Sequence, residues 1–182
     1  MNLLKAVWRP SSASDATDLD IERALHSHFV AEAFVEAKKS FDQGGLPIGS
    51  VLVRDRTIIG RGHNQRIQKG SAILHGEMDC ISNAGRQRTY RDTVIYTTLS
   101  PCMMCSGTIV QFGIPTVVIG ENQNFGGNEK FLHNRGVKVI ILNDSSCIDL
   151  MRRFIDGNKV LWSEDIGRVD VGGNARATAL EG

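Results

Sequence analysis

The 182-residue chain has no long hydrophobic run, and no apolar stretch approaches the ~20 residues that a membrane-spanning helix needs. Its first ten residues, MNLLKAVWRP, are too short and too interrupted by Lys5 and Arg9 to form a secretory signal peptide. Both absences argue against an integral membrane protein and a secreted one. We therefore expect a cytoplasmic protein with no membrane partner.

An excess of either charge is also absent. The 21 lysines and arginines nearly balance the 20 acidic residues, which leaves a formal net charge of +1, and the basic residues are scattered along the chain. A nucleic-acid-binding protein usually carries a basic patch or stripe. The balance therefore predicts a small neutral substrate and no nucleic-acid partner.

Cysteines are few, at positions 80, 102, 105 and 147. In a cytosolic chain such cysteines are more often free thiols or metal ligands than disulfide partners. Hydrophobic residues make up 41% and charged residues 23% of the sequence, as in ordinary globular proteins. The length suits one domain with a sizeable core.

Helical and strand patterns alternate along the chain. Apolar spacing and turn residues predict helices over 20–41, 75–83, 102–112, 128–134 and 145–155, and strands over 48–53, 57–61, 93–98, 116–120 and 137–142. This order predicts an α/β domain of three α-β-α layers, with a mixed five-stranded sheet between the helices.

Both ends of the chain differ in composition from this domain. Residues 1–19 are polar and rich in Ser, Asp and Thr, and residues 168–182 contain little large apolar surface. Segments of this kind seldom bury enough apolar area to stay ordered. We expect a loose leader over 1–19, the domain over 20–167 and a mobile tail over 168–182.

Two short motifs point to a metal. Cys102 and Cys105 are three residues apart at the start of a predicted helix, so both sulfur atoms lie on the same side. His75 begins another predicted helix, and a helix N-terminus favours a thiolate nearby. Zn²⁺ readily takes imidazole and thiolate ligands. We expect one zinc ion per subunit, bound by His75, Cys102 and Cys105.

Glu77 gives this site a catalytic character. Three protein ligands leave one tetrahedral position open, as in catalytic zinc sites, and a carboxylate two residues after His75 can move protons beside it. His-x-Glu followed by Pro-Cys-x-x-Cys is the signature of zinc deaminases. Three alternatives remain open: a redox Cys-x-x-Cys pair, a structural zinc closed by Cys80 or Cys147, and a chance coincidence of motifs.

The sequence around these motifs resembles the cytidine-deaminase-like superfamily, and within it the fungal-type zinc-dependent cytosine deaminases. The resemblance runs from about residue 28 to 167 and includes GRGHN at 60–64, QKGSA at 68–72 and YTTLSPC at 96–102. It implies a mixed five-stranded sheet flanked by helices, a homodimer, and hydrolysis of cytosine to uracil and ammonia. In that reaction Glu77 would shuttle protons beside zinc-activated water.

The same resemblance implies roles for five further residues. Asn64 would bind the pyrimidine carbonyl, and the backbone N–H of Gly76 would face the ring edge. Asp165 would accept a hydrogen bond from the exocyclic amine. Phe125 and Trp162 would line the pocket, beneath a lid formed by the C-terminal segment.

Two positions depart from the fungal-type pattern and keep other functions open. Ser163 stands where those enzymes have a second aromatic residue, and Met103 where they have an acidic one. A wider pocket would accept another small base, such as 5-methylcytosine, isocytosine, creatinine or guanine. A tRNA adenosine deaminase shares the cysteine motif but needs a basic surface. A non-catalytic zinc scaffold is the third alternative.

Overall fold

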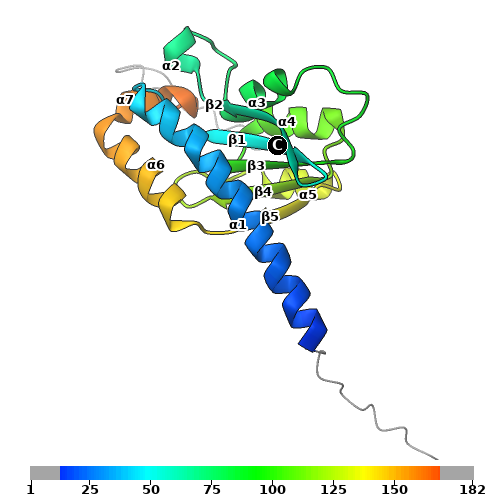
Figure 1. Ribbon diagram of the computed structural model, residues 1–182. Coiled ribbons are helices and arrows are strands. Elements are labelled where there is room, and N and C mark those ends of the chain that lie inside the picture. The colour runs from blue at the N-terminus through cyan, green and yellow to red at the C-terminus, as the bar shows by residue number, and fades with distance from the viewer. Residues whose placement is uncertain (1–12, 169–182) are drawn as a thin grey trace, which may run out of the picture.

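A twisted five-stranded sheet forms the centre of the computed structural model, which describes residues 13–168 (Figure 1). The strands are β1 (Gly49–Arg54), β2 (Thr57–His63), β3 (Thr93–Leu99), β4 (Thr116–Glu121) and β5 (Lys138–Ile141). Their spatial order is β2-β1-β3-β4-β5, with β1 antiparallel to β2 and β3, and β4 parallel to both β3 and β5. The mixed sheet expected from the sequence is confirmed.

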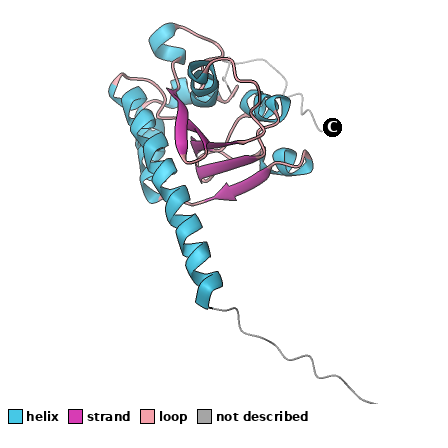
Figure 2. Ribbon diagram, turned by 45° about the vertical axis from the view of Figure 1, so that its right-hand side comes forward, coloured by secondary structure: helices cyan, strands magenta, loops and turns pink. Residues whose placement is uncertain are grey.

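Helices cover both faces of the sheet (Figure 2). One face is covered by α1 (Ala13–Asp42) and α6 (Ser145–Gly157), and the other by α3 (Gly76–Ala84), α4 (Met103–Phe112) and α5 (Glu129–Asn134). Two short helices, α2 (Arg66–Lys69) and α7 (Lys159–Asp165), lie at one end of the molecule. The three-layer α/β architecture is therefore confirmed.

Side chains of the central strands alternate between two hydrophobic clusters. In β1, Val51 and Val53 pack with α1 residues such as Phe29, whereas Leu52 packs with α3 and α4 residues such as Ile109. All of these side chains are buried. A strand covered on both faces needs a continuous apolar run rather than an apolar–polar alternation, and the β-branched sequence of β1 meets that need.

Helix α1 begins earlier than the sequence suggested. The loose leader was expected over 1–19, but residues 13–19 are helical, and of that segment residues 1–12 lie outside the described part of the chain. Residues 17–24 are exposed or nearly so, because this end of the helix projects past the sheet. A polar segment without Gly or Pro can extend a helix beyond the domain, because the side chains of that part of the helix do not have to pack against a core.

Two short helices were also missed. The sequence suggested a loop over 62–71 and no helix after residue 155, but the structure contains α2 and α7 in these regions. Helices of four and seven residues are too short to show a 3.6-residue periodicity. The expected tail, residues 168–182, lies outside the described residues except for Arg168. No helix within residues 13–168 has both the length and the apolar character needed to span a bilayer.

Helix α3 lies in direct contact with strand β2 because two glycines leave room for it. A Cβ atom at Gly62 would overlap the backbone nitrogen of Cys80, and one at Gly60 would lie 2.6 Å from the carbonyl oxygen of Cys80. Only residues without a side chain permit this approach. The glycines of the GRGHN segment therefore set the distance between β2 and the helix that carries Glu77.

Candidate active site

The three predicted metal ligands meet where two helices begin. His75 caps the N-terminus of α3, Cys102 caps that of α4, and Cys105 lies in the first turn of α4. Their ligand atoms all lie within 4.8 Å of one another, and the Sγ atom of Cys102 is 3.4 Å from Nδ1 of His75. The two helix N-termini thus direct their positive dipole ends toward one point.

This donor set fits a zinc ion. Zinc–nitrogen and zinc–sulfur bonds of about 2.0–2.3 Å place neighbouring tetrahedral ligands roughly 3.5 Å apart, close to the sulfur–nitrogen distance observed. A hydrogen bond from the Cys105 thiol lowers the pKa of Cys102 to about 4, so Cys102 is a thiolate at neutral pH. The same hydrogen bond raises the pKa of Cys105.

Among the described residues, the cluster offers three protein ligands, the number that catalytic zinc sites use. Within residues 13–168, the metal-ligating cluster comprises His75, Cys102 and Cys105, and neither Cys80 nor Cys147 joins it. Burial raises the pKa of both Cys80 and Cys147, as expected for thiols packed in a core. The alternative of a structural zinc closed by a fourth cysteine therefore has no support in the geometry.

Glu77 lies beside this cluster and is only 2% exposed. Burial is the main cause that raises the pKa of its carboxyl group to about 7, and the negative charge of Cys102 adds to the effect. A group with a pKa near the working pH both accepts and releases protons readily. Glu77 therefore has the environment of a proton carrier.

A small pocket opens beside the cluster. Its two aromatic walls, Phe125 from the loop after β4 and Trp162 from α7, meet edge to face with ring centroids 6.1 Å apart. The lining residues are Ile48, His75, Glu77, Leu99, Ser100, Cys102, Phe125, Trp162, Asp165 and Ile166. Segments distant in sequence thus enclose one space, with α7 along one side.

Three side chains from different parts of the chain contact one carboxylate oxygen of Asp165. Its Oδ1 atom lies 2.9 Å from Nη1 of Arg66, 3.3 Å from Nδ2 of Asn64 and 3.6 Å from Nε2 of His75. A carboxylate beside Nε2 favours a proton on that nitrogen and leaves Nδ1 free for a metal. Asp165 therefore connects α7 both to the predicted ligand His75 and to Asn64.

Asn64 and Gly76 lie next to the pocket rather than among its lining residues. Asn64 is 0% exposed, and its Oδ1 atom accepts a hydrogen bond from the backbone N–H of Arg66 at 3.1 Å. This bond orients the amide so that Nδ2 faces Asp165. Gly76 begins α3 against Ile48, whose carbonyl oxygen would lie 2.9 Å from a Cβ atom at position 76.

Sequence reasoning did not identify Arg66 as part of the site, nor Ile48, Leu99, Ser100 and Ile166 as pocket residues. No motif distinguishes Arg66 from other surface arginines, since its partner Asp165 is 99 residues away. The two departures from the fungal-type pattern differ in position. Ser163 does not line the pocket, whereas Met103 lines an adjoining hollow beside His75 and Cys102.

Comparisons with known proteins agree with this geometry. Residues 23–121 match the family model of the cytidine and deoxycytidylate deaminase zinc-binding region. The chain is 57% identical over 138 residues to the cytosine deaminase of Candida albicans, in a match that covers 74% of this chain and 92% of that protein. It is 39% identical over 141 residues to a tRNA-specific adenosine deaminase of Streptococcus pyogenes, covering 70% and 88% of the two chains.

A solved structure from a study of A-to-I editing by tRNA:A34 deaminases shares this fold, with a TM-score of 0.62 and 26% identity over 68% of this chain and 99% of that one. The fold and the His/Cys/Cys cluster define a zinc-dependent deaminase. The chain belongs to the cytidine and deoxycytidylate deaminase family. The predicted superfamily, enzyme class and zinc cofactor are thereby confirmed.

We expect the Cys102→Ala variant to lose zinc, because one of only three protein ligands disappears. Metal analysis of the purified protein should give far less than one zinc per chain. The Cys147→Ala variant is the matched control, since it also removes a buried thiol but one outside the cluster. Stoichiometric zinc in the Cys102 variant would contradict the ligand assignment.

Proposed function

We propose that this enzyme hydrolyses cytosine to uracil and ammonia. The observation that carries the proposal is the small pocket beside Glu77, which Phe125, Trp162 and Asp165 line, together with the 57% identity to a cytosine deaminase.

In the proposed reaction, Glu77 moves the protons. A bound zinc ion supplies Lewis acidity that lowers the pKa of a water molecule. Glu77 takes a proton from this water and delivers it to N3 of the ring, which makes C4 more electrophilic. After the remaining hydroxide oxygen adds to C4, Glu77 takes the proton of the new C4 hydroxyl group and passes it to the amine. The C4–N bond then breaks, ammonia leaves and the C4 carbonyl of uracil forms. The pKa near 7 suits both steps.

Residues from other segments hold the ring in our proposal. Asn64 donates its second amide proton to the pyrimidine carbonyl, while the first faces Asp165. Asp165 uses Oδ2 for the exocyclic amine, since Arg66 and Asn64 approach its Oδ1 atom. The backbone N–H of Gly76 faces the ring edge. Phe125 and Trp162 exclude water, which strengthens these polar contacts.

An ammonia-release screen tests the substrate. We expect the zinc-loaded protein to release ammonia from cytosine with a higher kcat/KM than from 5-methylcytosine, isocytosine, creatinine or guanine. Cytidine and tRNA adenosine should give none, because α7 borders the pocket and the chain has no excess of basic residues. Activity confined to nucleosides, or inosine formation in tRNA, would overturn the proposal.

We expect the Glu77→Gln variant to keep its zinc but to lose turnover by about 10³-fold or more, because glutamine cannot carry the proton. The measurements are kcat for ammonia release and zinc content of the same preparation. Glu164→Gln, an exposed glutamate on α7, serves as the control and should retain wild-type turnover. Near-normal kcat in zinc-loaded Glu77→Gln would refute the proposed role.

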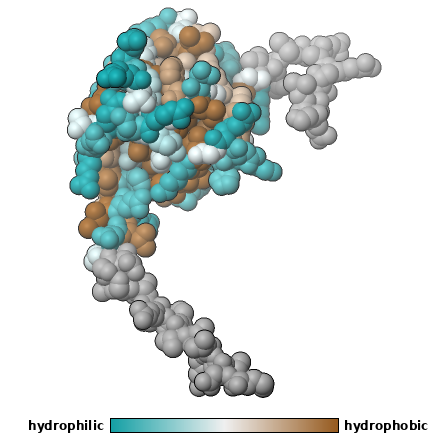
Figure 3. All heavy atoms as spheres, turned by 90° about the vertical axis from the view of Figure 1, so that its right-hand side faces the viewer, coloured by the Kyte–Doolittle hydropathy of each residue, from teal (hydrophilic) through white to brown (hydrophobic). Residues whose placement is uncertain are grey.

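We also propose a cytoplasmic homodimer without a nucleic-acid partner. Reduced thiols are needed for the metal cluster, and the four cysteines are free. Figure 3 shows apolar groups among hydrophilic ones on one face of the molecule. On α4, Phe112 is 43% exposed, which supports burial of this side chain against a second subunit.

Sedimentation velocity tests the dimer. We expect a species of twice the chain mass, and a shift toward monomer in the Phe112→Glu variant, because a buried charge opposes association. Val160→Glu, at an exposed apolar position on α7, is the control and should remain dimeric. A monomeric wild-type protein at micromolar concentration would contradict the proposal.

A further inference from the structure

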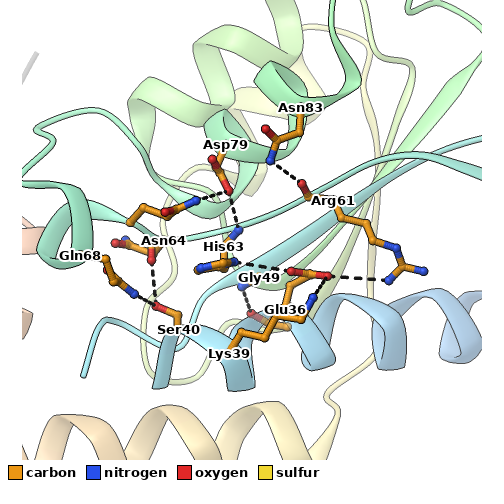
Figure 4. Close-up of polar contacts among 12 residues, drawn as sticks. Glu36, Lys39, Ser40, Gly49, Arg61, His63, Asn64, Gln68, Asp79 and Asn83 are labelled. Carbon is orange, nitrogen blue, oxygen red and sulfur yellow. Dashed lines mark hydrogen bonds and ion pairs between the residues drawn. The ribbon is translucent and has the colours of Figure 1, made fainter. Parts of the chain in front are cut away.

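Asn64 is positioned by its neighbours in the chain, which are themselves bonded to a carboxylate on α3. Asn64 follows directly after β2 and precedes α2, in a stretch without regular secondary structure. The Oδ2 atom of Asp79 accepts two hydrogen bonds there, one from the backbone N–H of His63 at 3.1 Å and one from Nε2 of Gln65 at 2.9 Å (Figure 4). Asp79 thus binds the residues on both sides of Asn64.

Other contacts fix the backbone of Asn64 itself. The hydroxyl of Ser40 on α1 donates to the Asn64 carbonyl oxygen at 2.8 Å (Figure 4). The Asn64 N–H donates to the Ile48 carbonyl oxygen at 2.8 Å. Asp79 differs from these two residues because it stands on α3, which begins at the predicted ligand His75 and carries Glu77. Its hydrogen bonds therefore connect the backbone on both sides of Asn64 to the helix that carries Glu77.

The close packing of α3 on β2 makes this arrangement possible. A side chain at Gly62 would displace α3 and carry the Asp79 carboxylate away from the His63 N–H. Asp79 is only 3% exposed, and a buried carboxylate is costly unless donors satisfy it. Its place in the first turn of α3 also favours negative charge. The N-terminus of α3 thus stabilises the buried Asp79 carboxylate, and the carboxylate accepts the hydrogen bonds that fix the backbone around Asn64.

Asp79 has no place among the residues that line the pocket. It does not face the space where the substrate would bind, so any effect on the reaction must act through another residue. We propose that Asp79 is a positioning residue, which holds Asn64 at a fixed distance from Glu77 by binding His63 and Gln65. This inference rests on the proposed contact between Asn64 and the pyrimidine carbonyl.

A double-mutant cycle with Asn64→Ala tests the inference. The single variants Asp79→Ala and Asn64→Ala and the double variant are compared for kcat and KM with cytosine, with zinc content and unfolding midpoint measured on each preparation. Asp79→Asn is the conservative variant, because its amide oxygen can accept both hydrogen bonds. Asn83→Ala is the matched control, since Asn83 also joins α3 to β2, through the Arg61 carbonyl oxygen at 2.8 Å, but away from Asn64.

We expect Asp79→Ala to keep its zinc and to lose about tenfold or more in kcat/KM, mainly through KM, because the net free energy of one hydrogen bond corresponds to roughly that factor. Asp79→Asn should recover most of the loss, and Asn83→Ala should behave as wild type. In the Asn64→Ala background, Asp79→Ala should have almost no further effect, because the contact it supports is already missing.

Multiplicative losses in the double variant would overturn the inference, since they would show that Asp79 acts on folding or on Glu77 independently of Asn64. An unchanged kcat/KM in Asp79→Ala would overturn it as well. If Asp79→Ala yields no folded, zinc-loaded protein, Gln65→Ala replaces it in the same cycle. This variant removes one of the two hydrogen bonds to Asp79 and is expected to give a smaller loss that again disappears in the Asn64→Ala background. Failure of the proposed function is distinguishable: wild-type protein would be inactive on cytosine, or Asn64→Ala would be fully active.

Discussion

The structure depends on the meeting of two helix N-termini at one point. Helices α3 and α4 begin at His75 and Cys102, and their unpaired N–H groups and positive dipole ends favour negative charge there. The Cys102 thiolate, with a pKa near 4, provides that charge. The buried Glu77 carboxyl, close to this thiolate, shifts in the opposite direction to a pKa near 7. One local arrangement thus produces both a thiolate in the cluster that could hold a metal and a carboxyl group whose pKa suits proton transfer.

The parts of the site that the sequence predicts are those built from short-range patterns. His-x-Glu and Cys-x-x-Cys each lie within one turn of a helix, so their spacing already determines which side chains share a face. The sheet was predictable for a similar reason, because its β-branched runs are bounded by turn residues. The contact between Arg66 and Asp165 spans 99 residues and leaves no local pattern. Helix α7 is too short for periodicity, and the first residues of α1 are mostly polar, so no apolar pattern indicates that residues 13–19 are helical.

In the proposed function, substrate choice depends on segments that the deaminase signature does not contain. Trp162 and Asp165 come from α7, and Phe125 comes from the loop after β4. Of the two departures from the fungal-type sequences, Ser163 does not line the pocket, whereas Met103 lines the adjoining hollow. Met103 is therefore the departure that bears on which base the site accepts.

Buried carboxylates connect these recognition segments to the catalytic helices and strands. Asp79 binds both neighbours of Asn64, and Glu121 at the end of β4 accepts hydrogen bonds from the backbone N–H groups of Gln123 and Asn124, just before Phe125. Each buried carboxylate has lost its water molecules and is stabilised by N–H groups of the loop instead. The loop therefore prefers the one conformation that makes these hydrogen bonds. The chemistry on α3 and α4 can then remain constant while the attached loops differ. Such a division is consistent with relatives of this chain that act on a free base or on tRNA.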